Sequence, residues 1–157
     1  MRKIAKTRPM ASVTLAAANA LIEEALKACC NIGFEAAIAV VDVTGNLCAF
    51  QRADGAPFFA AEVAVSKAWT AASCGIATHI WNDYVADPKL APLAKVDKLM
   101  AVGGGLPLFL EGKLIGGIGV SGGSHEQDRE AANAALAGMG FEIDAHTAPP
   151  NVESHDA

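Results

Sequence analysis

Apolar residues in this chain form long runs with helical spacing and short continuous runs. An alanine-rich segment, Val13–Ile32, follows Ser12 and stops before Gly33. This pattern predicts a helix that is capped by Ser12 and ends at a left-handed glycine. A second alanine-rich segment, Phe58–Ser73, follows Pro57 and predicts another helix. Two further helices are expected, one from His79 to Val85 and one that starts near His125.

The short apolar runs are separated by turn residues and predict two β-hairpins. Ala37–Val41 is too short for a typical helix, and Asp42–Asn46 provides a turn before the partner segment, Leu47–Arg52. The second hairpin is expected from Leu106–Glu111 and Leu114–Val120, with a turn at Gly112. Neither hairpin leaves room for a parallel crossover. We therefore expect a mixed α/β protein of the α+β type, in which helices flank an antiparallel sheet of two hairpins.

Length and composition indicate one domain that handles a small molecule. The chain has 157 residues, of which 52% are hydrophobic, enough for a core. We expect the domain to span 12–142, after an N-terminal extension (1–11) and before a flexible tail (143–157). The net charge of -5 argues against nucleic acid or an anionic membrane as the main partner. No uninterrupted apolar run reaches the roughly 18 residues that span a membrane.

The cysteine pattern favours a reducing compartment. Cys29, Cys30, Cys48 and Cys74 contain no C-x-x-C pair and no spacing that suits zinc. We expect them to be reduced and mostly buried thiols, with no metal site, and we expect the protein to act in the cytoplasm.

Several glycine motifs match known sites only superficially. Gly117–Gly122 fits the dinucleotide pattern G-x-G-x-x-G, but too little chain follows for a second βαβ unit. Gly119–Gly123 fits the nucleophile pattern G-x-S-x-G, which belongs to large parallel-sheet hydrolases. A structural turn explains this second match better. The run Gly103, Gly104 and Gly105 either exposes backbone amides that hold an anion beside a pocket, or forms a tightly packed bend.

Two histidines are candidates for proton transfer or for ligation of haem iron. His125 stands at a helix start after a glycine-rich turn, where its side chain can face a pocket. His79 either joins it or only caps a helix beside Trp81 and Tyr84. Together with a histidine, Trp81 and Tyr84 can furnish a pocket for a small aromatic acid.

Two basic residues lie in apolar surroundings and need partners. Arg52 and Lys67 can each form an ion pair with an acid or receive the carboxylate of a ligand. The sequence leaves both alternatives open.

Four ordered stretches resemble the GlcG/HbpS family, also known as the haem-degrading or DUF336 domain. They are Ala39–Asp42 with Gly45–Leu47, Arg52–Ala56, Lys67–Ala71, and Gly116–Gly123 with Gln127 and Asp128. The resemblance covers roughly residues 12–142. It implies a profilin-like antiparallel sheet flanked by helices, assembled into dimers and commonly octamers. Its members include haem-binding proteins, a domain of PduO-type corrinoid adenosyltransferases, and a few relatives implied to be lyases or hydrolases.

These observations lead to one expected function and one alternative. We expect a small-ligand-binding homo-oligomer, with haem as the family-derived candidate ligand. The alternative is a cofactor-independent lyase, isomerase or hydrolase that acts on a small intermediate of aromatic catabolism. In that case His125, with His79, would provide acid–base catalysis. Arg52 or Lys67 would hold the substrate carboxylate, and the amides of Gly103, Gly104 and Gly105 would stabilise negative charge.

Overall fold

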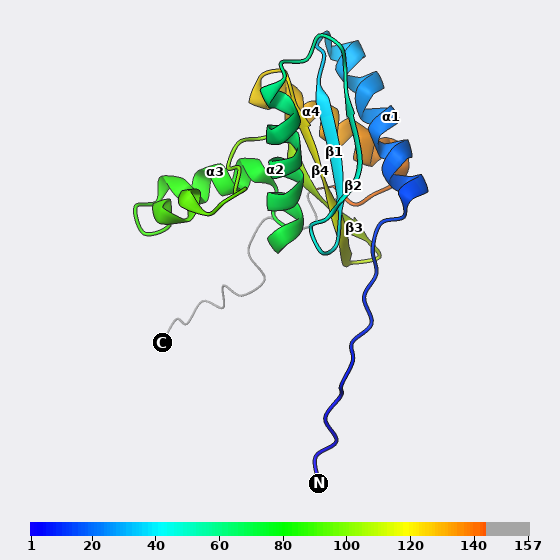
Figure 1. The fold of residues 1–157 in the computed structure, drawn as a ribbon, viewed down its shortest axis with the longest axis vertical. Coiled ribbons are helices and arrows are strands. Elements are labelled where there is room, and N and C mark those ends of the chain that lie inside the picture. Colours follow the sequence, from blue (N-terminus) through cyan, green and yellow to red (C-terminus); the bar gives the residue numbers. More distant parts are fainter. Residues whose placement is uncertain (144–157) are drawn as a thin grey trace.

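A four-stranded antiparallel sheet forms the centre of the protein (Figure 1). The structure is a computed structural model that describes residues 1–143, so most of the tail expected at 143–157 lies outside the described residues. The strands are β1 (Ala37–Asp42), β2 (Leu47–Arg52), β3 (Gly105–Leu110) and β4 (Lys113–Ser121). Their order in the sheet is β2-β1-β4-β3, and β1 pairs with β4 to join the two hairpins. The predicted α+β architecture is confirmed.

The helices begin and end within two residues of the predicted positions. They are α1 (Leu15–Ile32), α2 (Phe59–Cys74), α3 (Thr78–Ala86) and α4 (His125–Met139), with a short 3-10 helix, η1 (Ala91–Lys95). Gly33 ends α1 with a φ of 104°, as predicted for a left-handed glycine. Within residues 1–143, no helix combines the length and the apolar character needed to cross a bilayer.

The predicted cap of the first helix is wrong by two residues. The hydroxyl of Thr14, not Ser12, accepts the hydrogen bond from the amide of Ala17. Ser12 instead accepts a hydrogen bond from the amide of Val43 and donates to the carbonyl of Ile115. Both residues carry hydroxyls that suit a cap, so the local pattern does not separate them. Ser12 therefore ties the β1–β2 turn to β4.

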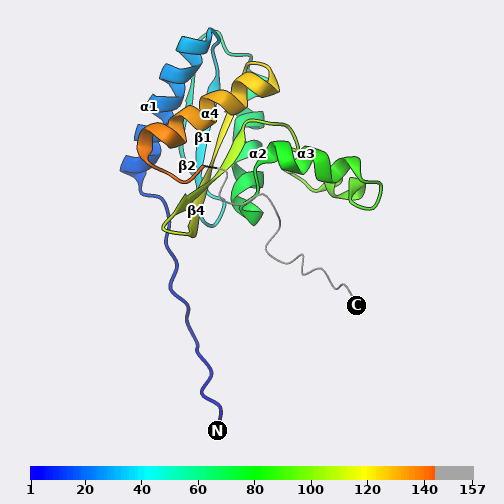
Figure 2. The same cartoon turned by 180° about the vertical axis from the view of Figure 1, so that it is seen from behind.

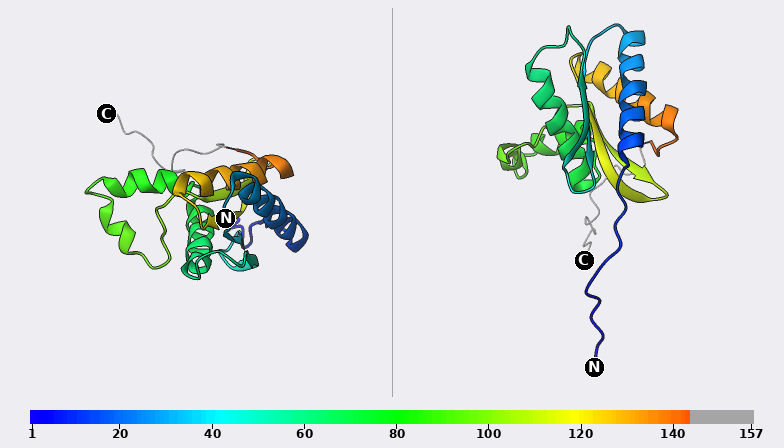
Figure 3. Two further views of the ribbon diagram at one scale, coloured as in Figure 1. Left: turned by 90° about the horizontal axis from the view of Figure 1, so that it is seen from above. Right: turned by 45° about the vertical axis from the view of Figure 1, so that its right-hand side comes forward.

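The helices form two unequal layers around the sheet. α1 packs against α4, and both cover one face of the sheet (Figure 2), whereas α2 covers the opposite face (Figure 3). Alternate residues of β1 face the two layers, with Ile38 and Val40 toward α1 and α4, and Ala39 and Val41 toward α2. α3 and η1 project sideways from this body (Figure 1).

Glycines in β4 allow α2 to lie unusually close to the sheet. A Cβ atom at Gly117 would overlap the carbonyl oxygen of Ala68, and one at Gly119 would overlap that of Ala64. Both glycines belong to β4, in agreement with the predicted strand Leu114–Val120. Gly122, with a φ of 146°, follows the strand. The motif is explained by helix–sheet packing.

The cysteines differ in exposure more than predicted. All four are free; Cys29 is buried and Cys48 is partly buried, but Cys30 and Cys74 are exposed. Burial raises the pKa of the Cys29 thiol to about 12, and the nearby negative charge of Asp128 adds to the effect. The expectation of mostly buried thiols is therefore wrong for half of them.

Candidate functional site

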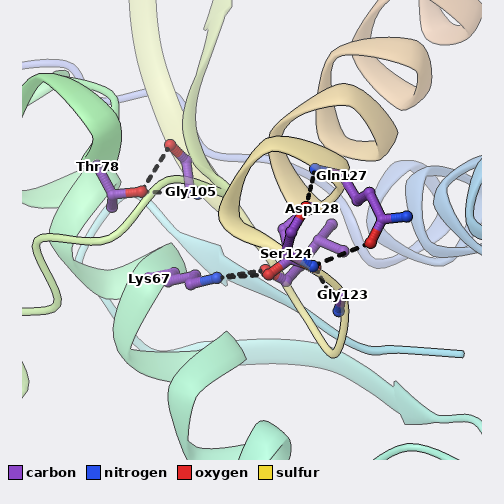
Figure 4. Close-up of polar contacts among 8 residues, drawn as sticks. Lys67, Thr78, Gly105, Gly123, Ser124, Gln127 and Asp128 are labelled. Atoms are coloured by element: carbon purple, nitrogen blue, oxygen red, sulfur yellow. Dashed lines mark hydrogen bonds and ion pairs between the residues drawn. The ribbon is translucent and has the colours of Figure 1, made fainter. Parts of the chain in front are cut away.

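A buried ion pair joins α2 to the first turn of α4 (Figure 4). The ammonium nitrogen of Lys67 lies 2.9 Å from Oδ2 of Asp128, and neither side chain is more than 3% exposed. Lys67 also donates to the carbonyl of Val120, and Oδ1 of Asp128 accepts a hydrogen bond from the amide of Gly123. Of the two alternatives that the sequence leaves open for Lys67, the structure contains the ion pair.

Burial disfavours the charged forms of Lys67 and Asp128, whereas the attraction between the two charges favours them. Desolvation lowers the pKa of Lys67 and raises that of Asp128, whereas the attraction and hydrogen bond between the two groups act in the opposite direction for each. Removing one partner would leave an uncompensated buried charge.

Of the three consecutive glycines, Gly104 packs directly against this ion pair. A Cβ atom at Gly104 would lie 2.9 Å from Nζ of Lys67 and 2.7 Å from Cβ of Asp128. The amide of Gly105 donates to the hydroxyl of Thr78 at 2.8 Å. Gly104 and Gly105 therefore form a tightly packed bend, and the amide of Gly105 already has a partner.

The first turn of α4 is fixed by a complete capping box. The hydroxyl of Ser124 accepts from the amide of Gln127, and the side chain of Gln127 accepts from the amide of Ser124. His125 is the first residue of this helix and lies between Ser124 and Gln127. The hydrogen bonds of the capping box therefore fix its backbone position.

Both candidate histidines line one pocket beside these elements. The pocket has a volume of about 350 Å³ and opens to solvent. His79 comes from α3, His125 from α4, and Gly103 from the glycine bend between them. A Cβ atom at Gly103 would lie 3.4 Å from Cβ of His79 and 3.2 Å from the carbonyl oxygen of His125. The other lining residues are Asn82, Asp83, Val102, Glu126 and Arg129.

Six of the predicted site residues do not line this pocket: Arg52, Lys67, Trp81, Tyr84, Gly104 and Gly105. Lys67 is enclosed beneath the glycine bend, as described above. Arg52 ends β2, where its guanidinium donates to the carbonyl of Ala56 at 2.8 Å. Trp81 is buried in α3, and its ring meets that of Tyr84 edge-on, with centroids 5.9 Å apart.

Sequence reasoning missed the polar residues that share the pocket with the histidines. Arg129 follows His125 by four residues, and Asp83 follows His79 by four. Residues at this spacing lie on the same face of a helix, so the signal was present. No group of three or more histidine, cysteine or acidic residues suited to a metal ion occurs in the described part of the chain.

Comparisons with known proteins agree with this fold. The model of the family described as haem degrading protein HbpS-like matches residues 13–137. A 15.0 kDa protein from the dhaT-dhaS intergenic region of Citrobacter freundii is 37% identical over 134 residues, which cover 83% of this chain and 94% of that protein.

Solved structures of similar sequence share the whole architecture. Protein ORFY of Klebsiella pneumoniae, described as DUF336, has a TM-score of 0.85 at 32% identity, covering 88% of this chain and 98% of that one. A crystal structure of a PduOC:heme complex has a TM-score of 0.77 at 30% identity, covering 83% of this chain and 97% of that one. Because the family match and these likenesses extend over nearly all of the domain, the chain belongs to the HbpS-like family.

Proposed function

We propose that this protein binds a small ligand in the two-histidine pocket, with haem as the candidate ligand. The observation that carries the proposal is the convergence of His79 and His125 on one solvent-open pocket, although they belong to different helices. Imidazole nitrogens are common axial ligands of haem iron. The relative solved as a PduOC:heme complex supports haem in particular.

The residues present suit part of a haem. One of the two imidazoles can ligate the iron, and the exposed guanidinium of Arg129 can receive a propionate carboxylate. Only Val102 and Gly103 offer apolar contact, and the volume of about 350 Å³ is at the small end of the range of about 300–1,000 Å³ for ligand pockets. A haem held here by one subunit would stay partly exposed, and a second subunit would be needed to cover it. Bound haem iron would supply redox and oxygen chemistry.

Titration with hemin, followed by the Soret band, tests this proposal. We expect saturable binding in the wild type and a weaker, spectrally altered complex in His79→Ala and His125→Ala. Cys30→Ser and Cys74→Ser are controls, because these exposed thiols are the obvious competing ligands. Unchanged titrations in both histidine variants would remove the histidines as iron ligands.

A second candidate function is cofactor-independent catalysis on a small aromatic-catabolism intermediate, as a lyase, isomerase or hydrolase. The observation that favours it is Arg129, one helical turn after His125 in the same pocket. The guanidinium can hold a substrate carboxylate while an imidazole exchanges a proton. Activity on such a substrate should fall about 100-fold or more in His125→Gln, with the fold intact. Full activity in that variant would contradict this role.

We also propose that the protein is a homo-oligomer, between a dimer and an octamer, in which the outer face of α2 contacts a second copy. Phe58 is 88% exposed and Phe59 is 61% exposed at the start of this helix. Beside them lies a groove of about 480 Å³, in which Glu62 and Lys98 can pair across a two-fold contact. Its other lining residues are Leu47, Phe50, Ala61, Val65, Ser66 and Asp97. A helix that is apolar on nearly all sides is normally covered on all sides.

A further inference from the structure

We propose that Lys67 and Asp128 are positioning residues for the two-histidine pocket, an inference that rests on the proposed ligand-binding function. Neither residue lines the pocket, and neither side chain is more than 3% exposed. Any influence on a ligand must therefore pass through the segments that they hold.

One of these segments carries His125. Asp128 lies one helical turn after His125, and its Oδ1 accepts the hydrogen bond from the amide of Gly123 at 2.9 Å. Its Oδ2 is held by Lys67, which also fixes the carbonyl of Val120 at the end of β4. The turn between β4 and α4, and with it the start of α4, is thus anchored to α2.

The other segment is the glycine bend, which lies beside His79. Gly104 packs on the ion pair so closely that a Cβ atom there would overlap three groups: Nζ of Lys67, Cβ of Asp128 and the carbonyl oxygen of Val120. The carbonyl of Gly104 accepts from the amide of Val120, and the amide of Gly105 donates to Thr78, the residue before His79. The two walls of the pocket therefore meet on one buried pair.

Stability alone is a weak explanation for this pair. Replacing a buried ion pair by apolar side chains of similar volume is often neutral or stabilising, because the desolvation of two charges offsets their attraction. An apolar double variant should therefore fold while it loses the contacts that hold the pocket walls. This property separates positioning from simple stabilisation.

The test uses two double variants and one stability control. Lys67→Met with Asp128→Leu removes every polar contact of the pair, whereas Lys67→Met with Asp128→Asn keeps a carbonyl oxygen for the amide of Gly123. Ile22→Val trims a fully buried side chain of α1, a helix that contributes no residue to the pocket lining, and lowers stability. Urea unfolding, hemin titration and the NMR signals of the histidine rings are measured for each, with ring signals assigned through the histidine-to-alanine variants.

We expect the Met/Leu variant to unfold cooperatively, to bind hemin about 10- to 100-fold more weakly with an altered Soret spectrum, and to show shifted ring signals for His79 and His125. The Met/Asn variant should be intermediate, and Ile22→Val should bind like the wild type. Wild-type affinity and ring signals in a folded Met/Leu variant would overturn the inference. If Met/Leu does not fold, the Met/Asn variant decides by the same criteria. If wild-type protein itself fails to bind hemin, the proposed function fails, but the ring signals still test the positioning role.

Discussion

Gly104 packs directly against the ammonium group of Lys67. A Cβ atom at position 104 would lie 2.9 Å from Nζ of Lys67. Gly104 also has a φ of 122°, a conformation that favours glycine. We expect Gly104→Ala to lower the free energy of unfolding by about 2–4 kcal/mol, from backbone strain and overpacking together. Urea denaturation measures the change.

Gly112→Ala is the matched control for this variant. Gly112 also has a positive φ, 73°, but nothing lies within 4 Å of a Cβ atom there. We expect it to cost only the strain of the conformation, about 1 kcal/mol. Equal losses at positions 104 and 112 would show that the contact with the ion pair carries no energetic weight.

Gly103→Ala should affect the ligand more than the fold. A Cβ atom there would stand between the two histidines, 3.4 Å from Cβ of His79 and 3.2 Å from the carbonyl oxygen of His125. Small shifts of these neighbours can relieve such contacts, so we expect a smaller loss of stability than in Gly104→Ala. Hemin affinity should nevertheless fall by about tenfold, since the pocket narrows where a ligand would enter. Unchanged affinity would place the ligand elsewhere.

The buried thiol of Cys29 predicts a loss of stability at alkaline pH. Its pKa is raised from 9.0 to about 12 in the folded protein. Between these values the folded state keeps a proton that the unfolded chain releases, so the free energy of unfolding falls as pH rises, by at most about 1.4 kcal/mol per pH unit from this group. Below pH 9 its contribution is fully present.

Urea unfolding of the wild type and of Cys29→Ala, below and above pH 9, tests this effect. The alanine variant should lose less stability than the wild type over the same pH interval. Cys30→Ser, which alters the neighbouring exposed thiol, should follow the wild type. Parallel pH dependence in wild type and Cys29→Ala would contradict the assignment.

A charge on the outer face of α2 should separate the subunits. Val65 lines the groove beside Phe58 and Phe59, and Val65→Glu would place like charges against each other across a two-fold contact. We expect the dissociation constant to rise by at least about 100-fold, as measured by light scattering or sedimentation at micromolar concentration.

Leu110→Ser provides the control for this interface. Leu110 is 48% exposed on β3, at the edge of the sheet opposite β2. It should leave assembly unchanged. A monomeric wild type, or a Val65→Glu variant that assembles normally, would refute the proposed contact.

Local sequence signals were sufficient to predict the helices and strands, because residues at the ends of these elements mark where they begin or stop. Pro57 lies just before α2, and Gly33 and Gly75 end α1 and α2 in left-handed conformations. Asp42 accepts hydrogen bonds from Thr44 and Asn46, as a turn residue does. Such signals act within a few residues, so they can be read without knowing the tertiary structure.

The candidate site depends on contacts between distant residues, which local patterns do not encode. Lys67 and Asp128 are 61 positions apart. In the sequence, Asp128 is already explained as an acid that interacts favourably with the helix dipole near an N-terminus. Nothing local therefore points to Lys67 as its partner. Trp81 is buried and does not line the pocket. The packing of α3 against its neighbours determines which way this side chain faces. The sequence allows His79 and His125 to lie close together but does not require it. Only the tertiary structure brings them to one pocket.

The close approach of α2 to β4 has a thermodynamic consequence. The residues that meet there are glycines on the strand and the stripe Ala60, Ala64, Ala68 and Ala72 on the helix. Glycine and alanine lose no side-chain rotamer entropy on burial, so this layer assembles without that cost. The same absence of rotamers means that the layer cannot adjust to one added methyl group. A Cβ atom at Gly117 or Gly119 would meet backbone atoms of α2, so a smaller side chain on the helix would not make room for it, and a larger residue on the strand should force the whole helix away from the sheet.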